Sequence, residues 1–147
     1  MKLRGLTAAL AGVLAALLCS CSLVEEPDAA AWDQQAAQAL EDAASEVATT
    51  RLALETAAQE RVWSSYTTVV VADAEEAIVT VADNLARVQA PAGRTEQAAD
   101  VGALMDRAVA SVRAARSLAV QGRYDDPASI DELDRLATDL EDAAGAR

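Results

Sequence analysis

Two cysteines near the amino terminus are the residues with the clearest chemistry. Cys19 and Cys21 are the only thiols in a chain of 147 residues that contains no histidine. A thiolate can act as a nucleophile or as a metal ligand. A zinc site is disfavoured, because no other cysteine and no histidine can complete the coordination shell. Covalent modification and a disulfide are therefore the alternatives to weigh.

The segment before these cysteines has the architecture of a secretory signal peptide. Lys2 and Arg4 make its start basic, and an uncharged apolar run follows from Leu6 to Leu18. This run has about 13 residues, whereas a helix needs roughly 20 to span a bilayer core. A permanent membrane span is disfavoured, and we expect residues 1–20 to be removed.

The residues around the second cysteine resemble the lipobox of bacterial lipoproteins. Leu18-Cys19-Ser20-Cys21 places a leucine, a tolerant position and a small residue before a cysteine. Cys21 is a better acceptor than Cys19, which follows a bulky leucine. The resemblance implies diacylglycerol attached to the Cys21 thiol, cleavage before Cys21 and usually acylation of the new amino terminus. Such cleavage would remove Cys19 and exclude a disulfide.

Residues 21–28 are expected to form a short tether behind this anchor. The reach of such a segment is on the order of 25 Å, at most ~3.5 Å per residue. Two or three acyl chains, at ~0.8 kcal/mol per buried methylene, would hold the protein firmly at a bilayer. We therefore expect residues 29–147 to form a domain at the extracytoplasmic face of the cell membrane.

The chain after the leader is strongly acidic. Its 12 basic and 24 acidic residues give a net charge of −12, which becomes −14 when Lys2 and Arg4 leave with the leader. Such a polyanion is repelled by nucleic acid and by anionic headgroups, so neither is an expected partner of the folded part. The charge can also serve solubility alone, and basic proteins and cations stay open as partners.

Catalytic chemistry has few candidate residues. The chain has no histidine and no lysine after Lys2, so the usual pairs of nucleophile and base are absent. Neighbouring carboxylates on a helix point in different directions, and the Asp125-Asp126 pair lacks the spaced ligands of an EF-hand. We expect neither an enzyme nor a metal site. The acidic clusters considered are Asp73/Glu75/Glu76, Asp125/Asp126, Asp131/Glu132/Asp134 and Asp139/Glu141/Asp142.

A group of arginines lies near one side of the third predicted helix. Arg113, Arg116 and Arg123 could bind an anion or a partner, but we expect them to pair with the acidic last helix. Within that helix, Asp131 and Arg135 have the i,i+4 spacing of an ion pair. Exposed pairs of this kind contribute little to stability.

Trp63 and Tyr66 stand out because the chain has only two tryptophans, two tyrosines and no phenylalanine. Either these two side chains fill the interior where alanine-rich faces leave space, or they contact a partner. Trp and Tyr are favoured at the energetic centres of protein interfaces. Both alternatives stay open from the sequence.

Helical periodicity predicts the elements that carry these residues. Residues 28–90 contain no proline or glycine, and apolar residues recur every three or four positions. We expect residues 28–90 to form one of two structures. One is a single helix of about 90 Å, and the other, which we favour, is a pair of helices joined by a bend near residues 63–67. Ser64, Ser65, Thr67 and Thr68 are the predicted N-caps of the second helix.

Two further helices are predicted after Pro91. One runs from about Thr95 to Gln121, with Gly122 in the C-terminal position. The other begins at a capping box, Ser129 to Glu132. Short connections favour antiparallel neighbours, so the fold class is an all-α, up-and-down bundle of three to four helices.

The whole organisation resembles small, alanine-rich, uncharacterised helical lipoproteins of actinobacteria. This resemblance implies a membrane-anchored protein without specifying its activity. We expect a non-enzymatic bundle that binds an envelope protein or supports envelope structure. The alternative is a lipoprotein that binds a small ligand or a cation.

Overall fold

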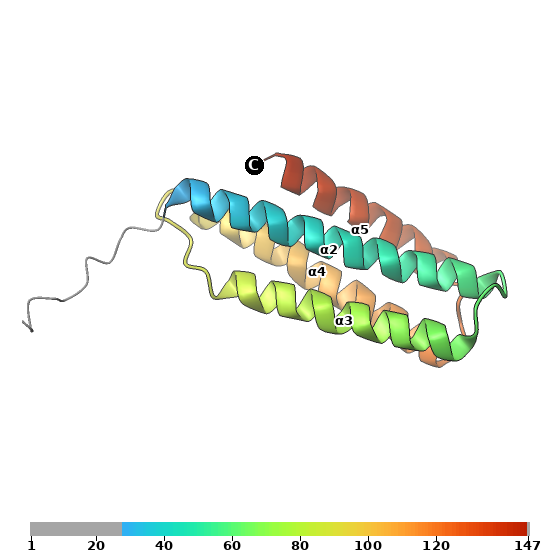
Figure 1. Cartoon of the computed structure of the whole chain (residues 1–147). Coiled ribbons are helices and arrows are strands. Elements are labelled where there is room, and N and C mark those ends of the chain that lie inside the picture. Colours follow the sequence, from blue (N-terminus) through green and yellow to red (C-terminus); the bar gives the residue numbers. More distant parts are fainter. Residues whose placement is uncertain (1–27, 147) are drawn as a thin grey trace, which may run out of the picture.

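The protein folds into four antiparallel helices in the computed structural model, which describes residues 28–146 (Figure 1). No strand occurs between these residues, which confirms the predicted all-α, up-and-down bundle. Cys21, the predicted leader and the predicted tether up to residue 27 lie outside the described residues. The helices are α2 (Ala29–Ala58), α3 (Ser64–Ala86), α4 (Thr95–Val120) and α5 (Pro127–Gly145).

Helices α2 and α4 form the central diagonal of the bundle. Each of them packs against both α3 and α5, and they also contact each other. The other diagonal pair, α3 and α5, is not in contact within the described residues. As a result, α3 and α5 are each held by their contacts with the central pair alone.

The core combines large leucines with many alanines. Alanines such as Ala36, Ala43, Ala108 and Ala115 are fully buried, and their small size lets the helices pack closely. Removing these apolar stripes from water supplies the main driving force for the bundle. The largest fully buried apolar side chains are Leu40, Leu54, Ile78, Leu133, Leu136 and Leu140.

The predicted break in the first helical segment is real, but its predicted position is wrong. Helix α2 ends at Ala58 and α3 begins at Ser64, so the chain reverses within residues 59–63. The Arg61 amide donates to the Thr56 carbonyl (3.0 Å) and the Glu60 amide to the Ala57 carbonyl (2.9 Å). These two bonds form a Schellman motif. Glu60 is the residue of this motif that adopts the left-handed conformation, with φ of 55°.

The predicted N-caps of α3 are also wrong. The capping position belongs to Trp63, whose side chain makes no capping hydrogen bond. The hydroxyls of Thr67 and Thr68 instead donate to the carbonyls of Trp63 and Ser64, four residues earlier. Hydroxyl side chains in the first turns therefore bond back along the helix rather than mark its first residue.

The turn between α4 and α5 follows the sequence prediction more closely. Gly122 has a φ of 71° and ends α4 in a second Schellman motif, in which the Arg123 amide donates to the Leu118 carbonyl at 3.0 Å. The capping box at Ser129 is wrong, because the helix begins earlier, at Pro127. Its N-cap is Asp126, whose carboxylate accepts from the Ser129 amide at 3.1 Å.

No helix within residues 28–146 is both long enough and apolar enough to cross a membrane.

Candidate functional site

The bundle has two ends with different surfaces. We call the end where α2 begins, α3 ends and α4 begins the tether end, because residues 21–27 connect to it. The opposite end, formed by residues 59–63, the start of α3 and the turn between α4 and α5, is called the tip. The two ends are separated by roughly 45 Å, the length of the 30-residue α2. They lie at opposite sides of Figure 1.

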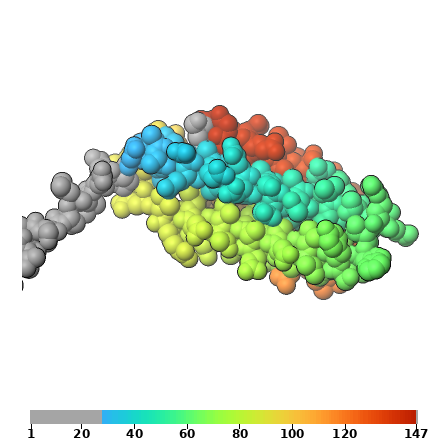
Figure 2. Space-filling view, viewed as in Figure 1, coloured from blue at the N-terminus to red at the C-terminus, as the bar shows by residue number. Residues whose placement is uncertain are grey.

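Large apolar side chains protrude from the tip half of the bundle. Trp63 is 85% exposed and Tyr66 60% exposed, so the interpretation that they fill the interior is wrong. All large exposed apolar residues among residues 28–146 lie in this half, and we call them the tip cluster. The members are Leu52, Trp63, Tyr66, Val69 and Val120. The green segment at one end of Figure 2 is the tip around residues 58–66.

Helix phase explains why the aromatic side chains are exposed. The buried face of α3 carries Thr67, Val71, Ala74 and Ile78, and Tyr66 lies beside that face rather than on it. Trp63 precedes the first helical turn. Together with Arg61 and Val62, the two aromatic residues line a shallow hollow of about 360 Å³.

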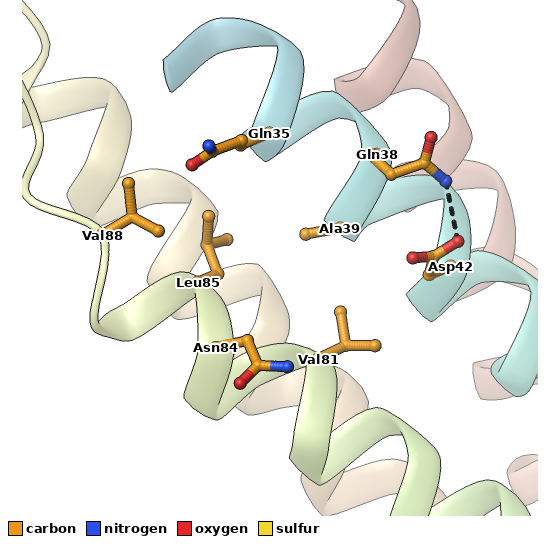
Figure 3. A pocket seen from close by; sticks show the side chains of 8 residues that line it. All are labelled: Gln35, Gln38, Ala39, Asp42, Val81, Asn84, Leu85 and Val88. Atoms are coloured by element: carbon orange, nitrogen blue, oxygen red, sulfur yellow. Dashed lines mark hydrogen bonds between the residues drawn. The ribbon is translucent and has the colours of Figure 1, made fainter. Parts of the chain in front are cut away.

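A groove between α2 and α3 lies near the tether end (Figure 3). Its volume is about 360 Å³, and we call it the α2–α3 groove. Ala39, Val81, Leu85 and Val88 make it apolar, and the Gln38 amide donates to Asp42 at its edge (2.8 Å). The residues that line it are Gln35, Gln38, Ala39, Asp42, Val81, Asn84, Leu85 and Val88.

A second groove of about 330 Å³ lies on the other side of the end of α3, against α4. Leu85 and Val88 line both grooves, and Trp32 and Met105 contribute to the second. The end of α3 therefore leaves apolar surface open on both of its sides. Asp106 is the one charged residue that lines the second groove.

The predicted arginine pairing is wrong for two of the three arginines. Arg113 and Arg116 bind both oxygens of Glu75 on α3, at 3.1 and 2.9 Å, and not the last helix. Hydrogen bonds from these guanidinium groups, with Arg116 the stronger, lower the pKa of Glu75. Arg123 pairs with Asp126, just before α5, at 3.3 Å. Their role is to connect elements of the fold.

Other arginines are also engaged in pairs between elements. Arg107 on α4 contacts Glu132 and Asp139 on α5, both at 2.9 Å, and these hydrogen bonds raise its pKa. Arg94 makes a two-bond contact with Asp33 at 2.8 and 2.7 Å and ties the loop before α4 to α2.

The predicted pair of Asp131 with Arg135 is wrong as well. The Arg135 guanidinium donates to the Asp131 backbone carbonyl, and its nearest carboxylate is that of Glu132 at 3.6 Å. Arg135 therefore finds its partners within α5, but the Asp131 carboxylate is not one of them.

Several carboxylates of α2 and α3 have no arginine partner. Among the ion pairs of residues 28–146, none includes Asp42, Glu46, Asp73, Glu76 or Asp83. Burial, and secondarily the charge of Asp42, raises the pKa of Glu46. The face that contains the α2–α3 groove is therefore negatively charged.

Acidic side chains in the described part of the chain do not converge on one point. No group of three or more histidine, cysteine, aspartate or glutamate residues there is arranged to hold a metal ion. The acidic clusters considered from the sequence spread over separate helices and pair with different arginines, as Glu75 and Glu132 do.

The grooves and three members of the tip cluster are not evident from the sequence alone. Val81, Leu85 and Val88 have the spacing of core residues, but they are only half-buried. The apolar side chains of Leu52, Val69 and Val120 protrude into solvent. Leu52, Val69 and Val120 lie off the buried stripes of their helices. No local signal marks the partial exposure of Val81, Leu85 and Val88, because it depends on how far α2 and α4 cover the end of α3.

Comparisons with known proteins give no assignment for this arrangement. The chain matches no protein-family model, no curated protein and no solved structure. A functional conclusion therefore has to rest on the leader, the two ends of the bundle and their charges.

Proposed function

We propose that this protein is a non-enzymatic extracytoplasmic lipoprotein, anchored through Cys21, whose helical bundle binds a partner protein of the cell envelope. The lipobox-like sequence Leu18 to Cys21 supports the anchor. The fold supports the binding role, because it presents surfaces on a rigid bundle rather than a constellation of catalytic groups.

The tip cluster is the observation that carries the binding role. Its five large apolar side chains protrude in the half of the bundle away from residue 28, and Trp63 and Tyr66 among them line one hollow. Exposed apolar patches on soluble domains mark interaction sites, and Trp and Tyr supply much of the binding energy at interfaces. An anchor at one end and a contact surface at the other suit a protein that reaches from the membrane to a partner.

The chemical state of the mature amino terminus tests the anchor. Mass spectrometry of protein extracted from membranes should show a lipidated cysteine at residue 21, and Cys21→Ala should yield an uncleaved or untethered chain. Ser20→Ala, which keeps a small residue before the cysteine, is the matched control and should be processed normally. An unmodified mature terminus at another residue would refute the anchor.

Photo-crosslinking in living cells tests the tip. A crosslinking residue in place of Tyr66 should form a discrete adduct with one envelope protein, and Trp63→Ala in the same chain should reduce its yield. A crosslinker in place of exposed Gln34, at the tether end, is the control. Equal adducts from both positions, or adducts unaffected by Trp63→Ala, would contradict the role of the tip.

One observation favours the alternative function, the binding of a small apolar ligand. The groove against α4 is mainly apolar, has a volume of about 330 Å³ and is lined by Trp32. That volume lies near the lower end of the range of small-molecule sites. A ligand there should change Trp32 fluorescence, and the change should persist in Trp63→Phe; if no apolar compound does so, this alternative fails.

A further inference from the structure

The apolar stripe of α3 continues beyond the part of the helix that the core covers. Its fully buried residues end at Ile78, whereas Val81, Leu85 and Val88 continue the same spacing and are only half-buried. In Figure 3 the side chains of Val81 and Leu85 point into the space between α2 and α3. An amphipathic helix normally buries its whole apolar stripe, so this end of α3 lacks part of its cover.

The charges around the α2–α3 groove restrict what can cover it. Asp42 lies at its edge, and Glu46 lies one turn further along the same side of α2. No arginine of the described residues pairs with any of these carboxylates. The nearby cation Arg87 is hydrogen-bonded to Asn84 at 3.3 Å. This face is turned toward the viewer in Figure 2.

A second copy of the chain fits this face poorly. Two α2–α3 faces brought together would bring Asp42 and Glu46 of both copies into one interface. Like charges across an interface disfavour association, whereas opposite charges steer and orient it. The charge pattern therefore selects a basic occupant over self-association.

We propose that the α2–α3 groove binds an amphipathic helix of the partner protein, with apolar side chains in the groove and Lys or Arg along its α2 edge. The lining on α2 extends from Gln35 to Asp42, about 10 Å at 1.5 Å per residue. This length accepts roughly two turns of a helix, which docks through apolar anchors at i, i+3 or i+4, and i+7. The inference rests on the proposed partner-binding function and defines the chemistry of the partner.

Binding of designed peptides to the mature lipidated chain in a neutral detergent tests this inference. The probe is a fluorescent helix of about 18 residues with leucines on one face and lysines on the other, long enough to cover the groove. The first control replaces its lysines by glutamates, and the second scrambles the sequence. Only the basic amphipathic peptide should bind, and rising salt should weaken the binding.

Paired variants locate the bound peptide. Asp42→Lys with Glu46→Lys should weaken binding by at least about 10-fold. Glu96→Lys with Asp100→Lys makes the same change of charge at exposed positions of α4 and should alter it by less than about 2-fold. Leu85→Gln should weaken binding, whereas Leu118→Gln, at a half-buried leucine between α4 and α5, should not.

Each contrary result has a distinct meaning. If the α4 charge variant weakened peptide binding equally, the attraction would come from the overall charge of the protein, and the proposed site in the groove would be wrong. Binding of the acidic or scrambled peptide, unaffected binding in Leu85→Gln, or no binding of the basic peptide would overturn it as well. Loss of binding in Trp63→Ala alone would reject the groove and leave the proposed role of the tip intact.

Discussion

The two ends of the bundle leave apolar surface in contact with water in opposite ways. At the tip, the core beneath is closed by Leu54, Val71 and Leu133, and the exposed side chains protrude. At the tether end, the side chains lie on the buried side of α3, but neighbouring helices do not fully cover them, so grooves result. The tip thus offers protruding side chains on a packed core, and the tether end offers a recess.

The difference is confined to the end of α3. Helix α3 contacts α2 and α4 but not α5, and its last two turns contain no fully buried residue. Helix α5, its diagonal counterpart, keeps Leu140 and Ala144 buried to its end. The apolar face of α3 is therefore packed less tightly in its last two turns than in the rest of the helix.

Truncating a leucine to alanine should give the largest difference between the two regions in the loss of unfolding free energy. Leu54→Ala, at a side chain that is 1% exposed, should destabilise the fold by about 2–5 kcal/mol through lost burial and a cavity. Leu85→Ala should cost less than about 1.5 kcal/mol, because that side chain is already partly exposed in a groove. Urea unfolding followed by circular dichroism measures both. Equal losses would show that the groove is as well packed as the core.

The two turns at the tip provide the next comparison. Gly122 and Glu60 occupy equivalent left-handed positions, with φ of 71° and 55°. Gly122→Ala should destabilise by about 1 kcal/mol, because an L side chain is strained there. Glu60→Gly should be neutral or stabilising, since it relieves the same strain. Thermal unfolding of both variants checks the signs, and a loss of stability in Glu60→Gly would contradict the turn geometry.

Glu75, which joins α3 to α4, should have a smaller effect with a defined pH dependence. Its pKa is lowered by hydrogen bonds from Arg116 and Arg113, so the charged form is favoured in the folded state. The stabilisation is complete above its ordinary value of 4.5 and is lost as pH falls through the lowered pKa of the folded state. Glu75→Gln should cost about 1 kcal/mol or less at pH 7, given the exposed arginines.

The matching measurement is the difference in stability between wild type and Glu75→Gln as a function of pH. This difference should shrink in acid, because protonated Glu75 has no charge for the arginines to bind. A difference that is constant from pH 7 to pH 3 would show that the ion pairs contribute nothing.

Glu46 should behave in the opposite sense and give the smallest effect. Burial, followed by the charge of Asp42, raises its pKa, so its charged form is disfavoured in the fold. Its favourable contribution is complete below 4.5 and is lost as pH rises through the raised pKa of the folded state. Glu46→Gln should therefore stabilise the protein by a few tenths of a kcal/mol at pH 7. Thr49→Ser is a neutral control on the same helix, and destabilisation by Glu46→Gln would contradict the assignment.

Local sequence signals predicted the regular parts of this molecule. Leu133, Leu136 and Leu140 follow one helical stripe and are all buried, and Gly122 ends its helix as expected. The turn at Glu60 was not predictable in the same way, because a glutamate in a left-handed conformation carries no local signal. An uninterrupted apolar phase through that turn is what made a buried Tyr66 one of the two alternatives, and the structure excludes it.

Features of the candidate site depend on which helices become neighbours. Arg113 pairs with Glu75 because α4 packs against α3, and periodicity alone does not decide between α3 and α5 as the source of its partner. The two aromatic residues at the tip were identified from their rarity, whereas the groove at Leu85 depends on the relative lengths and ends of α2 and α3. Amino-acid composition therefore pointed to the exposed aromatic residues at the tip but not to the groove near the tether end.

The orientation of the tip relative to the bilayer tests the central claim most directly. Trp63 fluorescence is measured as the difference between wild type and Trp63→Phe, with the lipidated chain in vesicles whose acyl chains carry bromine as a quencher. Because the tip lies roughly 45 Å from the start of α2, Trp63 should remain unquenched. Strong quenching of Trp63 would show that the tip inserts into the bilayer interface, where Trp and Tyr are also favoured, and would contradict its role as a surface for a protein partner.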